Sequence, residues 1–137
     1  MNQNNQERRE SQLDRRVVTV TTDFGTTDGY AGIVKGVITS IAPHACIIDL
    51  TNEIAPADIE AAAWVVNNSY KFFPATSVHL AVVDPGVGSK RRSVVLVTSR
   101  GSFVGPDNGI FSLVVQNEES ARAYLIENLD YCLPEIS

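Results

Sequence analysis

Residues 17–41, VVTVTTDFGTTDGYAGIVKGVITSI, place a strand, a glycine-containing turn and a helix in direct succession. Residues 17–22 are rich in β-branched side chains with little alternation of apolar and polar positions, which is typical of a parallel strand buried on both faces. In residues 30–41 apolar side chains recur at spacings of three and four, which predicts an amphipathic helix. Thr27 or Asp28 is placed to cap its first amides. A buried strand followed by such a helix favours an α/β fold.

The same order recurs further along the chain. Residues 46–50 and 78–83 are predicted to be the second and third strands, and a second helix between them ends before Pro74. Apolar side chains at helical spacing mark this helix: Ile59, Ala62, Ala63, Val66 and Tyr70. The alternation of strands and helices indicates right-handed crossovers, so the predicted architecture has three layers, a mostly parallel sheet flanked by helices.

The remaining residues extend this sheet. Two more strands are expected at 93–98 and 102–104, around a turn at Arg100, and a further strand is expected at 123–126. A short helix before the last strand is indicated by Ile110, Leu113 and Val114. The fold class is therefore α/β, with one domain predicted at 17–137.

Composition limits the partners of this domain. The chain has 137 residues, 44% of them hydrophobic, which is enough for one buried core, and its net charge is −5. The excess of acids argues against nucleic acid, whose phosphates are bound by clustered lysine and arginine. The apolar runs are far shorter than the roughly 20 residues of a membrane-spanning helix. We therefore expect neither a nucleic acid nor a membrane as partner, whereas a cationic ligand is mildly favoured.

The amino-terminal stretch and the cysteines bear on the cellular compartment. The polar stretch MNQNNQERRESQLDRR has no apolar segment of signal-peptide length behind it, so residues 1–16 are predicted to be a disordered tail and the location cytosolic. Cys46 and Cys132 lack the spacing of a zinc site or a disulfide framework. Both are expected to be buried thiols.

Two acids follow strands at the edge where ligands of open α/β sheets bind. Asp23 comes after the strand 17–22 and Asp84 after the strand 78–83, each with a glycine within two residues. Asp23 is either a turn residue that caps the next helix or an acceptor for sugar hydroxyls. The glycines around it do not have the spacing of a dinucleotide-binding or phosphate loop, so a standard NAD site is not expected.

Asp84 opens the stretch DPGVGSKRR, whose glycines allow the loop to fold back and bring Arg91 to the carboxylate. A carboxylate in such a pair stays ionised and is suited to hold and orient a water molecule or hydroxide. The alternative is a surface ion pair that steadies a hairpin. Arg92 is expected to be a solvated neighbour.

Three stretches taken together, in this order, resemble a known family: VVTVTTDFGTTDGYAGIVKG, VVDPGVGSKRR and FVGPDNGIF. They are similar to those of the S-adenosyl-L-methionine hydroxide adenosyltransferases, relatives of the fluorinase and chlorinase. The resemblance covers residues 17–137. It implies hydrolysis of S-adenosyl-L-methionine (SAM) to adenosine and L-methionine, by attack of water at the ribose 5′ carbon, with no metal or redox cofactor.

The resemblance also assigns roles to individual residues. Asp84 and Arg91 match two members of a water-holding Asp, Arg, His triad, and Asp23 matches the acid that binds the ribose. Asp28 matches a position that holds the methionine end of the substrate in halogenating relatives. The predicted substrate-binding set is Asp23, Phe24, Asp28 and Asn108.

The halogenating relatives differ at this site. They have a tyrosine at the position of Asp84 and a halide-contacting threonine at the position of Val87. An anionic Asp84 repels chloride or fluoride but accepts a hydrogen bond from water. Hydroxide transfer is therefore favoured over halide transfer.

Other features of the family concern the rest of the protein. The triad histidine lies in a Phe-His-Gly-Arg-Asp stretch that would follow residue 137, and it is replaced neither by His44, in a helix-to-strand turn, nor by His79, in a core position. The family's site forms in a trimer, where the amino-terminal domain of one subunit meets the β-rich carboxy-terminal domain of its neighbour. The resemblance thus implies a truncated chain with half a site, homotrimeric in its full-length form. The alternative is a nucleoside-binding or assembly module without turnover.

Overall fold

The computed structural model describes residues 15–133. The predicted tail falls mainly on residues 1–14, which lie outside the described part. The elements in chain order are β1 (Val17–Thr22), α2 (Tyr30–Ile41), β2 (Cys46–Thr51), α3 (Ile59–Ser69), the 3-10 turn η1 (Tyr70–Phe72), β3 (Val78–Val82), β4 (Ser93–Thr98), β5 (Gly101–Pro106), α4 (Ser112–Asn117), β6 (Arg122–Leu125) and the 3-10 turn η2 (Leu129–Tyr131).

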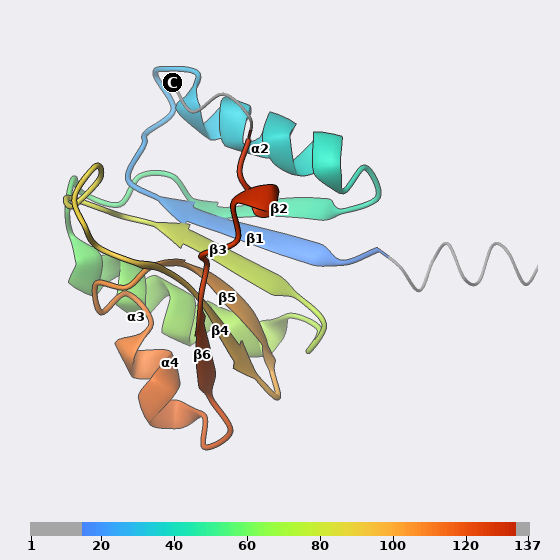
Figure 1. Cartoon of the computed structure of the whole chain (residues 1–137), viewed down its shortest axis with the longest axis vertical. Helices are drawn as coiled ribbons and strands as arrows, with labels where there is room; N and C mark the ends of the chain where they lie inside the picture. Colours follow the sequence, from blue (N-terminus) through green and yellow to red (C-terminus); the bar gives the residue numbers. More distant parts are fainter. Residues whose placement is uncertain (1–14, 134–137) are drawn as a thin grey trace, which may run out of the picture.

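The strands of the described residues form one mixed sheet in the order β2-β1-β3-β5-β4-β6. β1 is parallel to β2 and β3, and β5 is parallel to β3. β4 is antiparallel to β5 and β6, because a tight turn at Arg100 joins it to β5 as a hairpin. Helix α2 lies on one side of the sheet, and α3 and α4 lie on the other (Figure 1). The predicted α/β fold is confirmed.

The bounds of the elements differ little from those predicted. The strands β1 and β4 and the helix α2 have the predicted bounds. β5 is longer than predicted at both ends, because Gly101 and Pro106 also pair with β4. The last strand begins and ends one residue earlier than predicted.

The main hydrophobic core lies between the sheet and the helices α3 and α4. Its buried residues are Ile54, Ala62, Val66, Tyr70, Ala81, Val83, Val94, Leu96, Phe103, Ile110, Phe111 and Val114. Helix α3 begins at a capped end, where the side chain of Asp58 accepts a hydrogen bond of 2.9 Å from the amide of Ala61. This packing holds β1 and β3 in place from one side of the sheet.

The opposite face, under α2, is more open. Ala31 is the buried residue of this helix. Three large side chains of the predicted apolar face remain more than half exposed: Tyr30, Ile33 and Ile41. The amphipathic pattern therefore predicts the helix correctly but overstates how much of its surface is buried.

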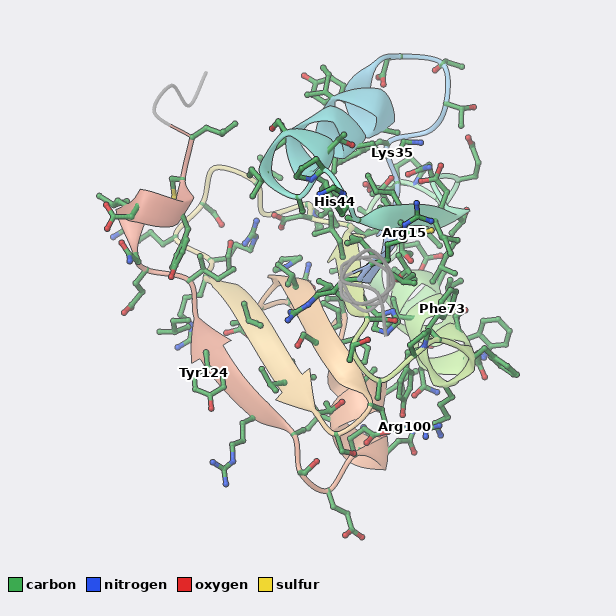
Figure 2. All side chains as sticks on the ribbon, turned by 90° about the vertical axis from the view of Figure 1, so that its right-hand side faces the viewer. Arg15, Lys35, His44, Phe73, Arg100 and Tyr124 are labelled. Carbon is green, nitrogen blue, oxygen red and sulfur yellow. The ribbon has the colours of Figure 1, made fainter. Side chains whose placement is uncertain are left out.

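An ion pair joins α2 to the sheet. Lys35 Nζ donates a hydrogen bond of 2.7 Å to Asp49 Oδ2 on β2, and Figure 2 shows Lys35 between this helix and the strand. The Lys35 hydrogen bond lowers the pKa of the Asp49 carboxyl. Both side chains are more than a third exposed, so the pair adds little to stability but fixes the position of the helix along β2.

His79 is buried in β3 among aromatic rings, which confirms its predicted core position. Its ring stacks on Phe103 at a centroid distance of 4.8 Å and meets Tyr70 and Phe73 edge-on. Its Nδ1 shares a hydrogen bond of 2.8 Å with the Thr19 hydroxyl. Burial lowers the pKa of His79 to about 4.

This buried imidazole should make stability depend on pH. The unfolded chain protonates His79 below about pH 6.5, whereas the folded chain does so only near pH 4, so the free energy of unfolding falls as the pH drops through this window. The loss should reach about 3 kcal/mol. Urea unfolding of the unsubstituted chain and of His79→Gln at pH 7, 5.5 and 4.5 measures it. Equal pH slopes for the two proteins would contradict the prediction.

The cysteines correct one expectation. Cys46 and Cys132 are both exposed, so the prediction of buried thiols was wrong. Cys46 opens the edge strand β2 and Cys132 follows η2, and neither position is covered by the core. His44 lies in the turn between α2 and β2, as predicted, and it is exposed. Within residues 15–133, none of the helices has the length and apolar content needed to span a membrane.

Candidate active site

The carboxyl ends of β1 and β3 lie side by side. These strands pair in parallel from Val18 opposite Val78 to Thr22 opposite Val82. Asp23 follows β1 and Asp84 lies two residues after β3, so both acids lie at one edge of the sheet, at the left of Figure 1. This is the edge at which open α/β sheets bind ligands.

Asp84 forms a buried ion pair with Arg91. Its side chain is 1% exposed, and that of Arg91 is 26% exposed. Asp84 Oδ2 accepts a hydrogen bond of 2.5 Å from Arg91 Nε and contacts Nη2 as well, and Oδ1 accepts one of 3.1 Å from the amide of Gly86. A carboxylate oxygen can accept more than one hydrogen bond, so Oδ1, with one donor among residues 15–133, keeps an unused lone pair. The predicted pairing is confirmed, with the Asp84 carboxylate buried and about a quarter of the Arg91 side chain exposed.

The loop between β3 and β4 is built around this pair. Arg91 Nη1 donates hydrogen bonds to the carbonyl of Arg92 (2.9 Å) and to Ser93 Oγ (3.1 Å), which fixes the guanidinium at the start of β4. Gly88 has φ +78°, a left-handed conformation that favours glycine. Val87 lies near it and is 74% exposed. The loop therefore exposes the apolar side chain of Val87 to solvent and covers the Asp84 carboxylate.

Arg92 pairs with a different acid. Its Nε and Nη2 donate hydrogen bonds of 3.1 Å and 2.7 Å to Asp107 Oδ2, just beyond the end of β5. The Arg92 side chain is 65% exposed, as predicted, but it has a partner, which was not predicted. The two neighbouring arginines thus differ, with one in a buried pair and the other in a solvated pair.

Asp23 contacts the loop before α3. Its Oδ2 accepts a hydrogen bond of 2.9 Å from the amide of Ala57, a residue held at φ +65°. The interpretation of Asp23 as a cap of α2 was wrong, because its carboxylate contacts Ala57 and the N-cap of α2 is Gly29. The amide of Tyr30, the first residue of the helix, donates a hydrogen bond of 3.1 Å to Asp28 Oδ1. Asp23 therefore links the end of β1 to the loop that leads into α3.

The other predicted substrate-binding residues fall into two groups. Phe24 follows Asp23, and its ring lies 6.1 Å from that of Tyr30, so it is at the same edge as the acids. Asn108 is engaged within the protein, since its Nδ2 donates to the Val83 carbonyl (2.9 Å) and its Oδ1 accepts from the Ile110 amide (3.2 Å). Asn108 thereby fixes the turn after β5 against the end of β3.

Two buried polar residues at this edge were missed by sequence reasoning. Thr22 is fully buried and Asn52 is 6% exposed. Thr22 Oγ1 donates a hydrogen bond of 2.8 Å to Asn52 Oδ1. In the sequence, each looks like an ordinary polar residue at the end of a strand. They could have been predicted only from knowing that β1 and β2 are neighbours that end together.

A separate cavity of about 440 Å³ lies between α4 and the strands β4 and β6. Apolar side chains line it, among them Leu96, Phe111 and Leu125, with the Arg92–Asp107 pair at its border. It is not lined by Asp23 or Asp84, so we place the candidate site at the acids. Within the described part of the chain, no cluster of three or more histidine, cysteine, aspartate or glutamate side chains could hold a metal ion.

The Asp84–Arg91 pair and the second acid, Asp23, lie at adjacent strand ends, the place where open α/β sheets bind ligands. The chain belongs to the SAM hydroxide adenosyltransferase family, because the model of the family's N-terminal domain matches residues 18–137. It is 43% identical over 120 residues to an (R)-S-adenosyl-L-methionine hydrolase of Methanocaldococcus jannaschii, covering 84% of this chain and 45% of that protein. A Thermus thermophilus protein of the same name is 40% identical, covering 82% of this chain and 44% of that protein.

More distant relatives and solved structures agree with this membership. A fluorinase from Actinoplanes sp. is 27% identical, covering 82% of this chain and 45% of that protein. The crystal structure of an uncharacterized conserved protein from Thermotoga maritima superposes with a TM-score of 0.80 at 38% identity, covering 82% of this chain and 44% of that one. The chain spans about half the length of the curated relatives it matches.

Proposed function

We propose that this chain carries the water-placing and ribose-binding side of a site that hydrolyses SAM to adenosine and L-methionine. The single observation that carries the proposal is the buried Asp84–Arg91 pair next to Asp23 at the carboxyl edge of the sheet. Relatives named (R)-S-adenosyl-L-methionine hydrolase, at about 40% identity, support it.

In the proposed reaction, a water oxygen forms a bond to the 5′ carbon of the ribose. The bond from this carbon to the sulfonium sulfur breaks, and its electron pair neutralises the sulfur, which leaves as the thioether of L-methionine. The attacking water loses one proton to Asp84 or to solvent. The reaction needs no metal or redox cofactor, because the sulfonium is already a good leaving group.

Asp84 and Arg91 orient the nucleophile in this proposal. The carboxylate accepts a hydrogen bond from the water, which turns a lone pair of its oxygen toward the substrate. Arg91 holds the carboxylate in one orientation, because its guanidinium is itself held by Ser93 and the Arg92 carbonyl. In this proposal, Asp84 and Arg91 therefore act mainly by positioning the water, and less by removing its proton.

The same carboxylate disfavours halide transfer. A chloride or fluoride beside Asp84 would face a like charge in a poorly hydrated position, since the side chain is 1% exposed. Val87, which stands where the halogenating relatives have threonine, offers no hydroxyl to a halide.

Asp23 is proposed to bind the ribose. Its Oδ2 is occupied by the Ala57 amide, and within residues 15–133 no protein donor reaches Oδ1. A free carboxylate oxygen at a strand end is suited to accept hydrogen bonds from sugar hydroxyls. Phe24 and Asp28 lie on the same loop and are proposed to contact the remainder of the substrate.

A second candidate function is binding without turnover. It is favoured by the positions of the histidines among residues 15–133: His44 precedes β2 and His79 is buried at the start of β3, whereas the two acids follow the carboxyl ends of the strands. In this version the chain holds a nucleoside, or assembles with other subunits as a homotrimer, without itself turning over SAM. Either version is proposed to act in the cytoplasm.

The test is incubation of the purified chain with SAM, followed by chromatographic separation of adenosine from 5′-halogenated nucleosides. A fusion to the second half of the M. jannaschii hydrolase is assayed beside it, with heat-inactivated samples as controls. Adenosine from both proteins establishes turnover by this chain, and adenosine from the fusion alone establishes the second candidate. No adenosine from either protein overturns hydrolysis, and 5′-chloro-5′-deoxyadenosine in chloride buffer would instead show halide transfer.

A further inference from the structure

The ends of β1 and β2 are joined by a buried polar network whose two side chains are Thr22 and Asn52. Thr22 is fully buried and Asn52 is 6% exposed. Burying hydroxyl and amide groups is unfavourable unless they are hydrogen bonded, and an apolar pair would fill the same space without this requirement. Their presence at the site edge therefore calls for a role that packing does not supply.

The hydroxyl of Thr22 closes a turn around Asp23. Thr22 Oγ1 donates to Asn52 Oδ1 at 2.8 Å and accepts a hydrogen bond of 3.2 Å from the amide of Phe24. Thr22 and Phe24 are the two neighbours of Asp23 in the chain. One hydroxyl thus fixes the backbone on both sides of the acid and anchors it to β2.

Backbone hydrogen bonds complete the connection. The amide of Gly25 donates to the Asn52 carbonyl at 2.7 Å, and the amide of Ile54 donates to the Thr22 carbonyl at 3.3 Å. The β2 segment then continues to Ala57, whose amide holds Asp23 Oδ2. Both the backbone and the carboxylate of Asp23 are therefore positioned by the segment that follows β2.

Two backbone conformations indicate that surrounding contacts hold the backbone around Asp23 in this geometry. Gly25 has φ +70°, which glycine adopts without strain, but Ala57 has φ +65°, where a residue with a Cβ is strained. Such strain persists only where surrounding contacts hold it in place, and it aims the Ala57 amide at the carboxylate. Ala57 and the Thr22–Asn52 network therefore both position Asp23.

We infer that Thr22 and Asn52 are positioning residues for Asp23, which they hold in the orientation that accepts the ribose hydroxyls. The inference rests on the proposed function, because it assigns a purpose to the ribose-binding acid. Neither residue contacts the ligand in this scheme. They act by lowering the number of orientations that Asp23 can adopt before the ligand arrives.

The substitutions Thr22→Val and Thr22→Ser separate positioning from packing. Valine keeps the shape of the side chain but removes the hydroxyl, whereas serine keeps the hydroxyl. The matched control is Thr21→Val, because Thr21 is fully buried in the same strand and its hydroxyl has no partner among the described residues. Titration calorimetry with adenosine and with SAM gives affinities, and hydrogen exchange reports the Phe24, Gly25 and Ala57 amides.

Thr22→Val should bind both ligands roughly tenfold more weakly, as expected for one lost buried hydrogen-bonding group. The three amides should exchange faster in this variant, while Thr22→Ser and Thr21→Val should stay close to the unsubstituted chain in both measurements. If Thr22→Val binds as tightly as the unsubstituted chain, the inference is overturned and the proposed function stands. If the unsubstituted chain and its fusion bind neither ligand, the proposed function fails. In that case hydrogen exchange still tests whether the Thr22 hydroxyl holds the turn around Asp23. Unchanged amide exchange in Thr22→Val would overturn this structural role, whatever the binding result.

Discussion

Replacing Asp84 with asparagine should reduce the rate of adenosine formation from SAM by about a hundredfold or more, measured in whichever of the chain and its fusion is active. Asparagine keeps the size of the side chain but removes the charge that pairs with Arg91 and that we propose orients the water. Because the proposal assigns the ribose to Asp23 and only the water to Asp84, the KM should change far less than the kcat. Chromatographic rates over a range of SAM concentrations give both constants.

The matched control for this variant is Asp107→Asn. It removes the partner of Arg92, the neighbouring arginine, but from a pair whose side chains are 65% and 41% exposed. A solvated pair contributes within about 1 kcal/mol, so both rate and stability should stay close to those of the unsubstituted chain. Equal rate losses for the two variants would show that the Asp84 effect arises from general perturbation of the loop, and an unchanged rate for Asp84→Asn would remove its water-placing role.

The substitution Gly105→Ala should destabilise the fold severely. An added Cβ at this position in β5 would lie 2.3 Å from the Ala81 carbonyl oxygen and 3.0 Å from Phe111 Cζ. The carbonyl belongs to β3, which is held between β1 and β5, so it has little freedom to move away. We expect the free energy of unfolding to fall by about 3 kcal/mol or more and the Tm by roughly 10 °C.

Gly36→Ala is the control for the glycine prediction. A Cβ at Gly36, in the exposed part of α2, meets no atom within 4 Å. Because glycine is a poor helix former, alanine there should raise the free energy of unfolding by about 0.5–1 kcal/mol. Thermal unfolding followed by circular dichroism compares the three proteins, and a Tm for Gly105→Ala equal to that of the unsubstituted chain would show that β3 and β5 can separate to admit the methyl group.

Local patterns predicted much of this fold. The bounds of α2 follow from its apolar spacing and from Pro43 beyond its end, and the Asp84–Arg91 pair follows from a glycine-rich loop that joins residues close in sequence. Both depend on interactions within one segment. This is why they could be deduced from the sequence without knowing how the strands are ordered.

What the sequence did not predict depends on contacts between distant segments. The Thr22–Asn52 hydrogen bond exists only because β1 and β2 are neighbours that end together, and neither residue type marks it. The exposure of Cys46 depends on β2 being an edge strand. The contact of Asp23 with Ala57 likewise needs the loop before α3 to turn back over β1.

The place of β1 in the sheet has a consequence for how the molecule forms. β1 comes first in the chain but lies between β2 and β3, so it has no complete set of partners until β3 has been made. During synthesis, an emerging chain that stops short of β3 cannot have both acids in place, because one of them follows that strand. Long-range parallel pairing of this kind is slow. The edge that carries both acids therefore forms only after β3 has been made and paired, and the proposed affinity for a nucleoside should appear no earlier than that step.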